Sequence, residues 1–318
     1  MHDIPSELTR RPFTRAEALA LGLTPRMLQG ARFVRLYPRV WRHRDHVMTP
    51  ASWITAGRLA LPDGAALTGI SRIQQLGLDL GPRAPLHFVL PGRLHLAFEG
   101  MVLHRTVLMP PLDGEGTVTP AASFISYCTH ARLIDAVMVG DWLLHHEHMS
   151  VGELDALFDA QPWRDGVEEA RLVVPFLDGH SRSVKESETR MLLVASGLPM
   201  PEANVELRVI REAVVTADLV YVVYLVVVEY EGAQHQEDRA QYLGDVDRYG
   251  LMRRHKVRYV QVTKEKLRAP RSVPRAVYAE LREAGYKGPA PEFGEVWHQL
   301  FRPVRDLTPR RPARRRVG

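Results

Sequence analysis

A carboxylate ends the most apolar stretch of this chain, and few folds can accommodate it there. Residues 219–228 are all Leu, Val or Tyr, and Glu229 follows them directly. A Val-rich run of this kind forms a buried strand, whereas burying an unpaired carboxylate costs roughly several kcal/mol or raises its pKa. We therefore expect Glu229 to have a partner, and a divalent cation fits best.

A second acid precedes the same apolar run. If Val214–Val220 and Leu225–Tyr230 form a hairpin with a two-residue turn at 223–224, Asp218 lies directly opposite Glu229. Such cross-strand pairs are about 5 Å apart at Cβ. The turn residues are Val and Tyr, not the Gly, Asn or Asp that usually supply positive φ, so the register is open by one residue or more.

Side-chain alternation predicts that a third carboxylate joins this face. Asp218, Glu229 and Glu231 then point the same way, and Tyr230 points away. Carboxylates gathered on one face repel one another unless a cation lies between them. A set of oxygen ligands open to water is typical of Mg²⁺ or Mn²⁺, with Asp218 and Glu229 as the metal ligands.

Residues of about 183–285 resemble the core of the PD-(D/E)XK nuclease superfamily, in the branch of the very-short-patch repair endonucleases and a related actinobacterial domain. The expected order is helix, three strands, helix, strand and helix. The matching residues are Ser187-Glu188-Thr189-Arg190 opening a helix Met191–Ser196 that Gly197 stops, Asp218, Glu229 with Gly232 and His235, Asp245 and Arg248 on a helix 236–255, and a strand Val257–Val262.

The resemblance implies a metal-dependent DNA endonuclease whose catalytic set is Glu188, Asp218, Glu229, Glu231 and His235. The chain departs from the superfamily where Glu231 replaces the usual Lys, which helps to activate the attacking water. His235 is the best substitute, because a neutral imidazole can accept a proton near pH 7; Gln234, Lys256 and Lys264 are further candidates. A domain that binds DNA without cutting it is the alternative.

The N-terminal residues have the pattern of a winged helix-turn-helix. Thr14 and Glu17 form a capping box, and the helix Arg15–Leu21 ends at Gly22. Thr24 caps a second helix with Pro25 at its first position. Residues 33–42 alternate as a two-stranded wing, so the helix from Pro25 is expected in the major groove of DNA.

Five arginines are the predicted DNA contacts in this part. The pattern Arg-Leu-x-Pro-x-Val-Trp at 35–41 resembles the N-terminal domain of AbiEi-type abortive-infection antitoxins, which implies DNA binding and a cognate toxin as a possible partner. The alternative is a small helical domain that packs on its neighbour. The five are Arg26, Arg32, Arg35, Arg39 and Arg42.

Positive charge is concentrated at the two ends of the chain. Residues 1–48 carry a net charge of +5 and residues 301–318 carry +6, whereas residues 49–300 sum to −6. Arginine-rich ends indicate a phosphate-binding surface. We expect residues 291–318 to be a basic, disordered tail that either binds phosphate or keeps the protein soluble.

Composition excludes several other classes. No run of eighteen apolar residues predicts a membrane span, no signal-peptide pattern is present, and the single Cys128 forbids an intrachain disulfide. We expect a cytoplasmic α+β multidomain protein with a winged helix-turn-helix (1–48), a mixed α/β then helical region (49–180), a restriction-endonuclease-like α/β/α domain (181–290) and the tail.

Overall fold

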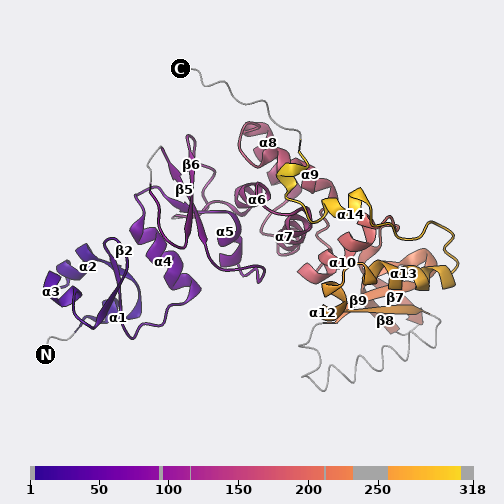
Figure 1. Cartoon of the computed structure of the whole chain (residues 1–318), viewed down its shortest axis with the longest axis horizontal. Helices are drawn as coiled ribbons and strands as arrows, with labels where there is room; N and C mark the ends of the chain where they lie inside the picture. Colours follow the sequence, from indigo (N-terminus) through magenta and orange to yellow (C-terminus); the bar gives the residue numbers. More distant parts are fainter. Residues whose placement is uncertain (1–3, 93–95, 115, 211–212, 232–256, 309–318) are drawn as a thin grey trace. The chain divides into compact units, whose positions relative to one another are not determined.

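The computed structural model of the chain divides into two compact units, Met1–Ser126 and Tyr127–Gly318 (Figure 1). It describes residues 4–92, 96–114, 116–210, 213–231 and 257–308. In the described residues the first unit contains helices and two small sheets and the second contains helices and one sheet, so the protein is a multidomain α+β protein, as predicted.

The first unit begins with three short helices and a small sheet. The predicted capping box is confirmed: the Glu17 N–H donates to Thr14 Oγ1, and the Thr14 N–H donates to Glu17 Oε2. Thr24 caps the next helix through the Met27 N–H, as predicted. The elements are α1 (Ser6–Arg10), β1 (Phe13–Thr14), α2 (Arg15–Ala20), α3 (Pro25–Leu28), β2 (Phe33–Tyr37) and β3 (Val40–His43).

This sheet has three strands, whereas the alternation at 33–42 predicted two. Strand β1 pairs with β3, giving the order β1-β3-β2. Phe13 is fully buried in a cluster with Leu8 of α1 and Phe33 of β2. Two residues of strand are too short to show a period in the sequence, and the buried phenyl ring explains why they join the sheet.

A second layer of the first unit consists of α4 and a sheet with α5. In this sheet β5 pairs antiparallel with β4 and parallel with β6. Helix α4 packs closely on β5 at Gly57, which has no side chain. A Cβ at this position would lie only 2.8 Å from the Phe88 ring. The elements are α4 (Pro50–Ala60), β4 (Ala66–Leu67), α5 (Gly69–Gln75), β5 (Leu86–Pro91), β6 (Met101–Thr106) and α6 (Pro120–Cys128), which runs into the second unit.

An apolar cluster joins these two parts of the first unit. Tyr37 and Val40 of the small sheet pack with Ala56 and Ala60 of α4. The domain boundary predicted at 48–49 therefore lies inside one unit, because the core is continuous across it.

The second unit combines a helical part with a four-stranded sheet. Helix α10 (Val184–Ala195) packs against α7 and against the sheet, and α13 (Ser272–Glu283) packs against α10 and the same sheet (Figure 1). The helical part contains α7 (Leu133–His145), α8 (Val151–Ala160), α9 (Val167–Val173) and the 3₁₀ turn η1 (Val174–Phe176).

Helix α10 starts earlier than the sequence indicated. Ser183 is its N-cap, accepting a hydrogen bond from the Glu186 N–H at 3.2 Å. Residues 187–190 therefore lie inside the helix instead of opening it. Gly197 follows the helix with φ +85°, which agrees with its predicted role as a stop.

The sheet of the second unit has the order β10-β9-β8-β7, and only β9 and β10 are parallel. Short α12 (Lys264–Arg268) follows β10. The predicted helix 236–255 lies outside the described residues. The strands are β7 (Glu202–Ile210), β8 (Ala213–Tyr221), β9 (Val226–Glu231) and β10 (Arg258–Thr263).

The hairpin between β8 and β9 has a longer turn than predicted. Residues Val222–Tyr224 form the 3₁₀ turn η2, and Leu225 adopts φ +51°. Leu225 thus supplies the positive φ that the sequence seemed to lack. The paired register, Leu219 with Val228 and Val220 with Val227, is nevertheless the one predicted.

Residues 291–308 are folded, which corrects their assignment to a disordered tail. Trp297 and Val304 are buried, and the Val304 N–H donates to the carbonyl of Ala131 at 2.8 Å. Their large apolar side chains outweigh the effect of the nearby arginines. The segment contains α14 (Glu295–Gln299) and the 3₁₀ turn η4 (Val304–Asp306); residues 309–318 lie outside the described residues.

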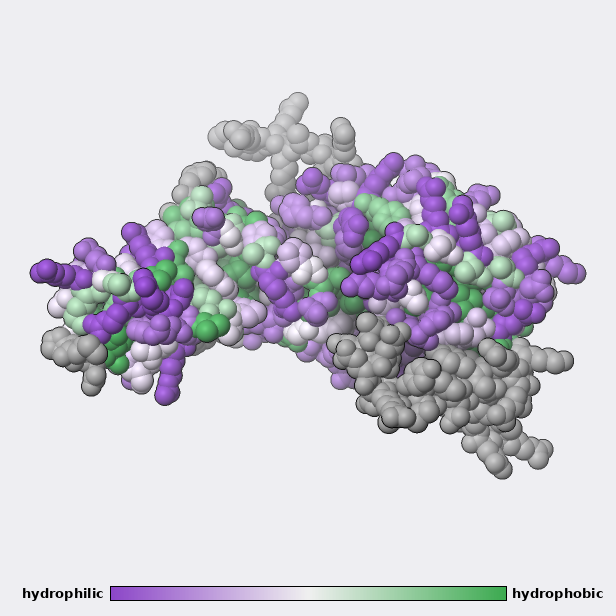
Figure 2. Space-filling model, turned by 60° about the horizontal axis from the view of Figure 1, so that its bottom comes forward, coloured by the Kyte–Doolittle hydropathy of each residue, from purple (hydrophilic) through white to green (hydrophobic). Residues whose placement is uncertain are grey.

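The surface of each unit drawn in Figure 2 is mainly hydrophilic, with small hydrophobic patches. Among the helices that the structure describes, none has both the length and the apolar character needed to cross a bilayer.

Candidate functional site

Two carboxylates follow the paired part of β8 and β9. The paired register ends at Leu219 with Val228, so Asp218 and Glu229 are the next residues along the two strands. The Tyr230 N–H donates to Asp218 Oδ2 at 3.0 Å, so the Asp218 side chain reaches across to β9. Glu229 is only 3% exposed. Two acids from adjacent strands thus converge at the edge of an apolar core.

The same face of the sheet becomes apolar one step towards the turn. Side chains two residues apart on a strand share a face, so Val220 and Val227 lie beside the acids. Both valines are fully buried. A low-polarity surrounding strengthens electrostatic interactions with any ion held there.

Glu231, the third predicted carboxylate, bonds to the parallel strand β10. Its Oε1 accepts a hydrogen bond from the Tyr259 hydroxyl at 3.3 Å, and its Oε2 accepts one from the Gln261 amide. Glu231, where the resemblance implies a Lys, therefore accepts hydrogen bonds from these two neutral side chains.

Glu188 lies on α10 and is bonded within its own helix. Lys185 Nζ donates to Glu188 Oε2 at 2.6 Å, and the Glu188 side chain is 20% exposed. Helix α10 packs against β8 and β9, the strands that carry the two acids. Arg190, from the same motif, is instead buried against Asp141 of α7.

The remaining predicted catalytic residue, His235, lies outside the described residues, as do Gln234 and Lys256. Lys264 is exposed at the start of α12. Asp218 and Glu229 suit a hard cation such as Mg²⁺ or Mn²⁺, because both offer carboxylate oxygens. In the part of the chain that the structure describes, no three His, Cys, Asp or Glu side chains are grouped closely enough to hold a metal ion.

Four of the predicted DNA-contacting arginines lie exposed on the small N-terminal sheet and its helices. Arg26 is on α3, which is a single turn, and Arg32 precedes β2. Arg35 lies over the Trp41 ring, 5.7 Å from its centroid. Arg39 has φ +66° in the β2–β3 turn.

Arg42 has a different environment from the other four. Its Nη1 donates to the carbonyl oxygens of His43, Arg44 and His46 at 2.6–3.1 Å. The guanidinium therefore folds the loop after β3. Nothing in the local sequence distinguishes Arg42 from Arg39, because the carbonyls converge only once the loop has formed.

Sequence reasoning did not identify Tyr259 and Gln261 as neighbours of the acids. They lie on β10, in parallel register with β9, so that Gln261 pairs with Glu229. The alternation of Tyr259, Gln261 and Thr263 with apolar residues does indicate a strand with one polar face. It does not indicate that this strand pairs with β9, because that pairing joins residues far apart in the sequence.

Comparison with known proteins finds two similar chains, both from Mycobacterium tuberculosis. They are the "Uncharacterized protein Rv2248" of strain H37Rv and the "Uncharacterized protein MT2308" of strain CDC 1551. Each is 25% identical over 203 residues, which cover 62% of this chain and 75% of the relative. No family model matches the chain, and no solved structure matches it.

Proposed function

We propose that this protein binds DNA and cleaves or nicks its phosphodiester bonds at a metal-dependent site on β8 and β9. The observation that carries the proposal is that the Asp218 carboxylate reaches β9 through the Tyr230 N–H, directly after the buried Glu229. Burying a carboxylate at a strand end is costly, and a purely structural strand end does not require it.

In this proposal Asp218 and Glu229 would hold one Mg²⁺ or Mn²⁺ ion. A bound Mg²⁺ supplies Lewis-acid charge that polarises the phosphodiester under attack. The hydrogen bond from the Tyr230 N–H keeps the Asp218 carboxylate turned towards Glu229. Gln261 of β10 is the register partner of Glu229, and its side-chain amide donates a hydrogen bond that holds the Glu231 carboxylate in place.

The order of elements around the acids supports the resemblance to the PD-(D/E)XK superfamily. Helix α10 is followed by β7, β8 and β9, and then by β10, the short α12 and α13. This order agrees with the helix, three strands, strand and helix that the resemblance implies for the described residues. Glu188 on α10 is proposed to assist the metal site from the helix that packs on the acid-bearing strands.

The N-terminal helices and sheet are proposed to act as a winged helix-turn-helix. Helices α2 and α3 are joined by a short turn through Gly22, and the β2–β3 hairpin presents Arg35 and Arg39. Because α3 is only four residues long, its base contacts are expected from Arg26 and its neighbours, with most affinity coming from phosphate contacts.

The deciding experiment is incubation of the purified protein with plasmid, linear, mismatched and single-stranded DNA under Mg²⁺ or Mn²⁺. We expect cutting that EDTA abolishes. Glu229→Gln should be inactive and still bind DNA. His235→Ala tests the sequence-based assignment of the proton acceptor, and it should slow cleavage by about 10²–10⁴-fold. No cutting of any substrate by the wild-type protein rejects the enzyme.

The second candidate is a DNA-binding regulator or antitoxin with a nuclease-derived domain that does not cut. The observation in its favour is Glu231, which stands where the superfamily has Lys and accepts hydrogen bonds from Tyr259 and Gln261. A neighbouring gene for a nucleotidyltransferase-like toxin, and a stable complex with that toxin, would support this candidate.

A further inference from the structure

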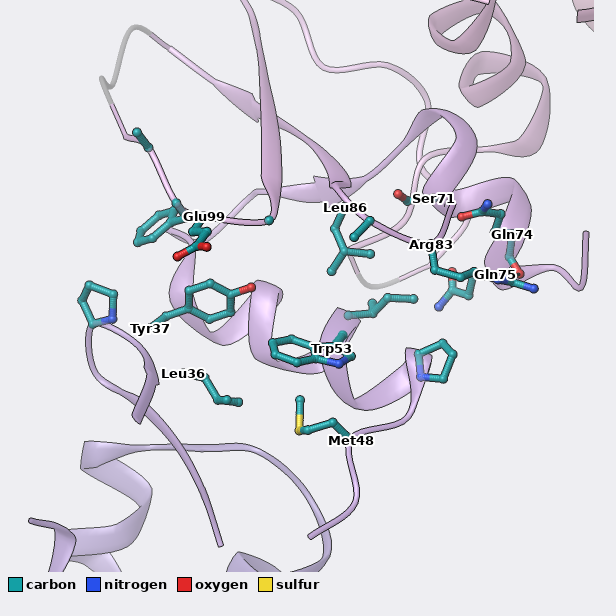
Figure 3. A pocket seen from close by; sticks show the side chains of 17 residues that line it. Leu36, Tyr37, Met48, Trp53, Ser71, Gln74, Gln75, Arg83, Leu86 and Glu99 are labelled. Carbon is teal, nitrogen blue, oxygen red and sulfur yellow. Dashed lines mark hydrogen bonds between the residues drawn. The ribbon is translucent and has the colours of Figure 1, made fainter. Parts of the chain in front are cut away.

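A cavity of about 810 Å³ opens in the first unit, between the β2–β3 hairpin, α4, α5 and the residues that precede β6 (Figure 3). Its size falls in the range of about 300–1,000 Å³ that is typical of small-molecule sites. Most of its wall is apolar or aromatic, and the main contributors are Leu36, Tyr37, Met48, Trp53, Leu86 and Phe98.

Trp53 is the most unusual residue of this wall. It lies on the first turns of α4 and is 40% exposed, although its neighbours in the cavity are apolar. Figure 3 shows its indole between the hairpin residues Leu36 and Tyr37 and the α5 side of the cavity. An indole that is left partly open beside other apolar side chains provides a stacking surface for a planar ring.

The aromatic wall is held in place by contacts behind it. The Tyr37 and Phe98 rings pack edge to face with centroids 5.8 Å apart. Tyr37 also belongs to the apolar cluster with Ala56 and Ala60 of α4. The wall is therefore preformed, which lowers the entropic cost of binding.

A positive charge lies at one end of the cavity. Arg83 donates from Nη1 to the carbonyl of Gln74 at 3.0 Å, which orients its guanidinium. Its other contact, to Asp79 at 3.3 Å, involves a carboxylate that is 98% exposed. Such a solvated ion pair contributes little to stability. An acidic group of a ligand can therefore bind the Arg83 guanidinium in place of Asp79 or together with it.

A negative charge lies at the other end, beside Tyr37. Burial raises the pKa of the Tyr37 hydroxyl, and the charge of Glu99 raises it further. Figure 3 shows Glu99 on the side of the cavity away from Arg83 and Gln75. The two ends therefore differ in charge, and an anionic group is directed towards Arg83.

We infer that this cavity is a binding site for an aromatic small molecule that carries an acidic group, such as an aromatic carboxylate or sulfonate. The ring lies against Trp53 and the Tyr37–Phe98 wall, and the acidic group lies at Arg83. A wholly apolar ligand would leave the guanidinium unused, and a small inorganic anion would leave the aromatic wall exposed to water.

The site is adjacent to the hairpin that carries Arg39. Tyr37 and Pro38 line the cavity and lead directly into the β2–β3 turn. If the proposed DNA binding by this hairpin holds, a ligand that packs against Tyr37 changes the affinity for DNA. This consequence rests on the proposed function, whereas ligand binding itself does not.

Two fluorescent probes that differ in one group test the site on the full chain, without DNA. Anilinonaphthalene sulfonate has the aromatic rings and the acidic group, and phenylnaphthylamine has similar rings without the sulfonate. We expect saturable binding of the sulfonate with energy transfer from tryptophan. Trp53→Ala should lower the affinity for both probes about tenfold. Trp53→Phe should retain most of the wild-type affinity.

Arg83→Gln should lower the affinity for the sulfonate about tenfold and leave the affinity for the neutral probe unchanged, because only the charged hydrogen bond to the sulfonate is lost. Trp163 is the matched control, since it is also 40% exposed but lies in the second unit. Trp163→Ala should change the affinity for neither probe.

Unchanged affinity of Trp53→Ala for the sulfonate overturns the site. An equal loss of affinity for both probes in Arg83→Gln overturns the proposal that the ligand is acidic. A DNA-binding measurement with and without the sulfonate then tests the coupling separately.

Discussion

Asp141 Oδ2 accepts a hydrogen bond from Arg190 Nη2 at 2.7 Å, and both side chains are almost completely buried. The same Nη2 donates to the carbonyl of Phe176, and the Asp178 N–H donates to Asp141 Oδ1. Burial raises the pKa of Asp141, while the charge of Arg190 and the bond from Asp178 limit the rise. This pair joins α7, α10 and the loop after η1 through complementary charges.

Breaking the pair on one side should be costly. Arg190→Met leaves Asp141 buried without its cation, so we expect a loss of about 3–5 kcal/mol in the free energy of unfolding. The double variant Asp141→Leu/Arg190→Met should recover most of the loss. Urea unfolding measures both. Arg132→Ala, which breaks the exposed pair with Asp135, should cost less than about 1 kcal/mol; an equally small effect of Arg190→Met would contradict the role of the buried pair.

Divalent metal should stabilise the second unit through Asp218 and Glu229. With free Mg²⁺ or Mn²⁺ at about a hundred times its Kd, mass action adds about 2.7 kcal/mol. Asp218→Asn should abolish the gain, although the amide oxygen can still accept from the Tyr230 N–H and keep the hairpin intact. Thermal unfolding with metal or EDTA measures this effect. An equal melting shift in wild type and variant would exclude the site.

The two basic ends should contribute differently to DNA binding. Deleting residues 309–318 removes five arginines, so affinity should fall for all sequences and the salt dependence should flatten by about 0.9 per lost contact. Arg26→Ala should instead alter sequence preference. Arg171→Ala, an exposed arginine of the second unit, is the charge control. If the deletion and Arg26→Ala both behave like this control, neither end contacts DNA.

Leu225 should be a site of local strain. A left-handed backbone is unfavourable for a residue with a branched apolar side chain, and Leu225 is also 44% exposed. Leu225→Asn should therefore raise the free energy of unfolding by about 0.5–1 kcal/mol, since Asn tolerates this conformation. Val223→Asn, two residues earlier in the same turn and 87% exposed, should bring no gain. Chemical denaturation of the three proteins distinguishes these outcomes.

His46 should make the first unit sensitive to mild acid. Burial lowers the pKa of His46, and the nearby charge of Arg42 lowers it further. The unfolded chain, with its His pKa near 6.5, then binds more protons than the folded chain, so stability falls as the pH decreases below that value. His46→Gln should remove this part of the pH dependence. A stability profile of the variant parallel to that of wild type between about pH 7 and 5 would contradict the assignment.

Local sequence was sufficient at three helix ends, where the signal lies within a few neighbouring residues. The Thr14–Glu17 capping box, the Thr24 cap and the Gly197 stop depend on neighbouring residues, and the structure confirms them. The sequence also predicted the register that the hairpin has, Leu219 with Val228, but left it open by one residue or more, because the register of a hairpin depends on its turn. The actual turn, with Leu225 at positive φ, was not predicted.

The sequence by itself therefore determined the caps at Thr14 and Thr24, the helix stop at Gly197 and the alternation of side chains along the strands. Only the tertiary structure decided which distant groups share a buried environment. Arg190 reads as part of a nuclease motif, yet its partner Asp141 lies 49 residues earlier. The cavity beside Trp53 and the packing of Trp297 likewise depend on elements far apart in the chain. The reason is physical: a cap forms between adjacent residues, whereas a buried charge or a cavity wall exists only after the whole core has assembled.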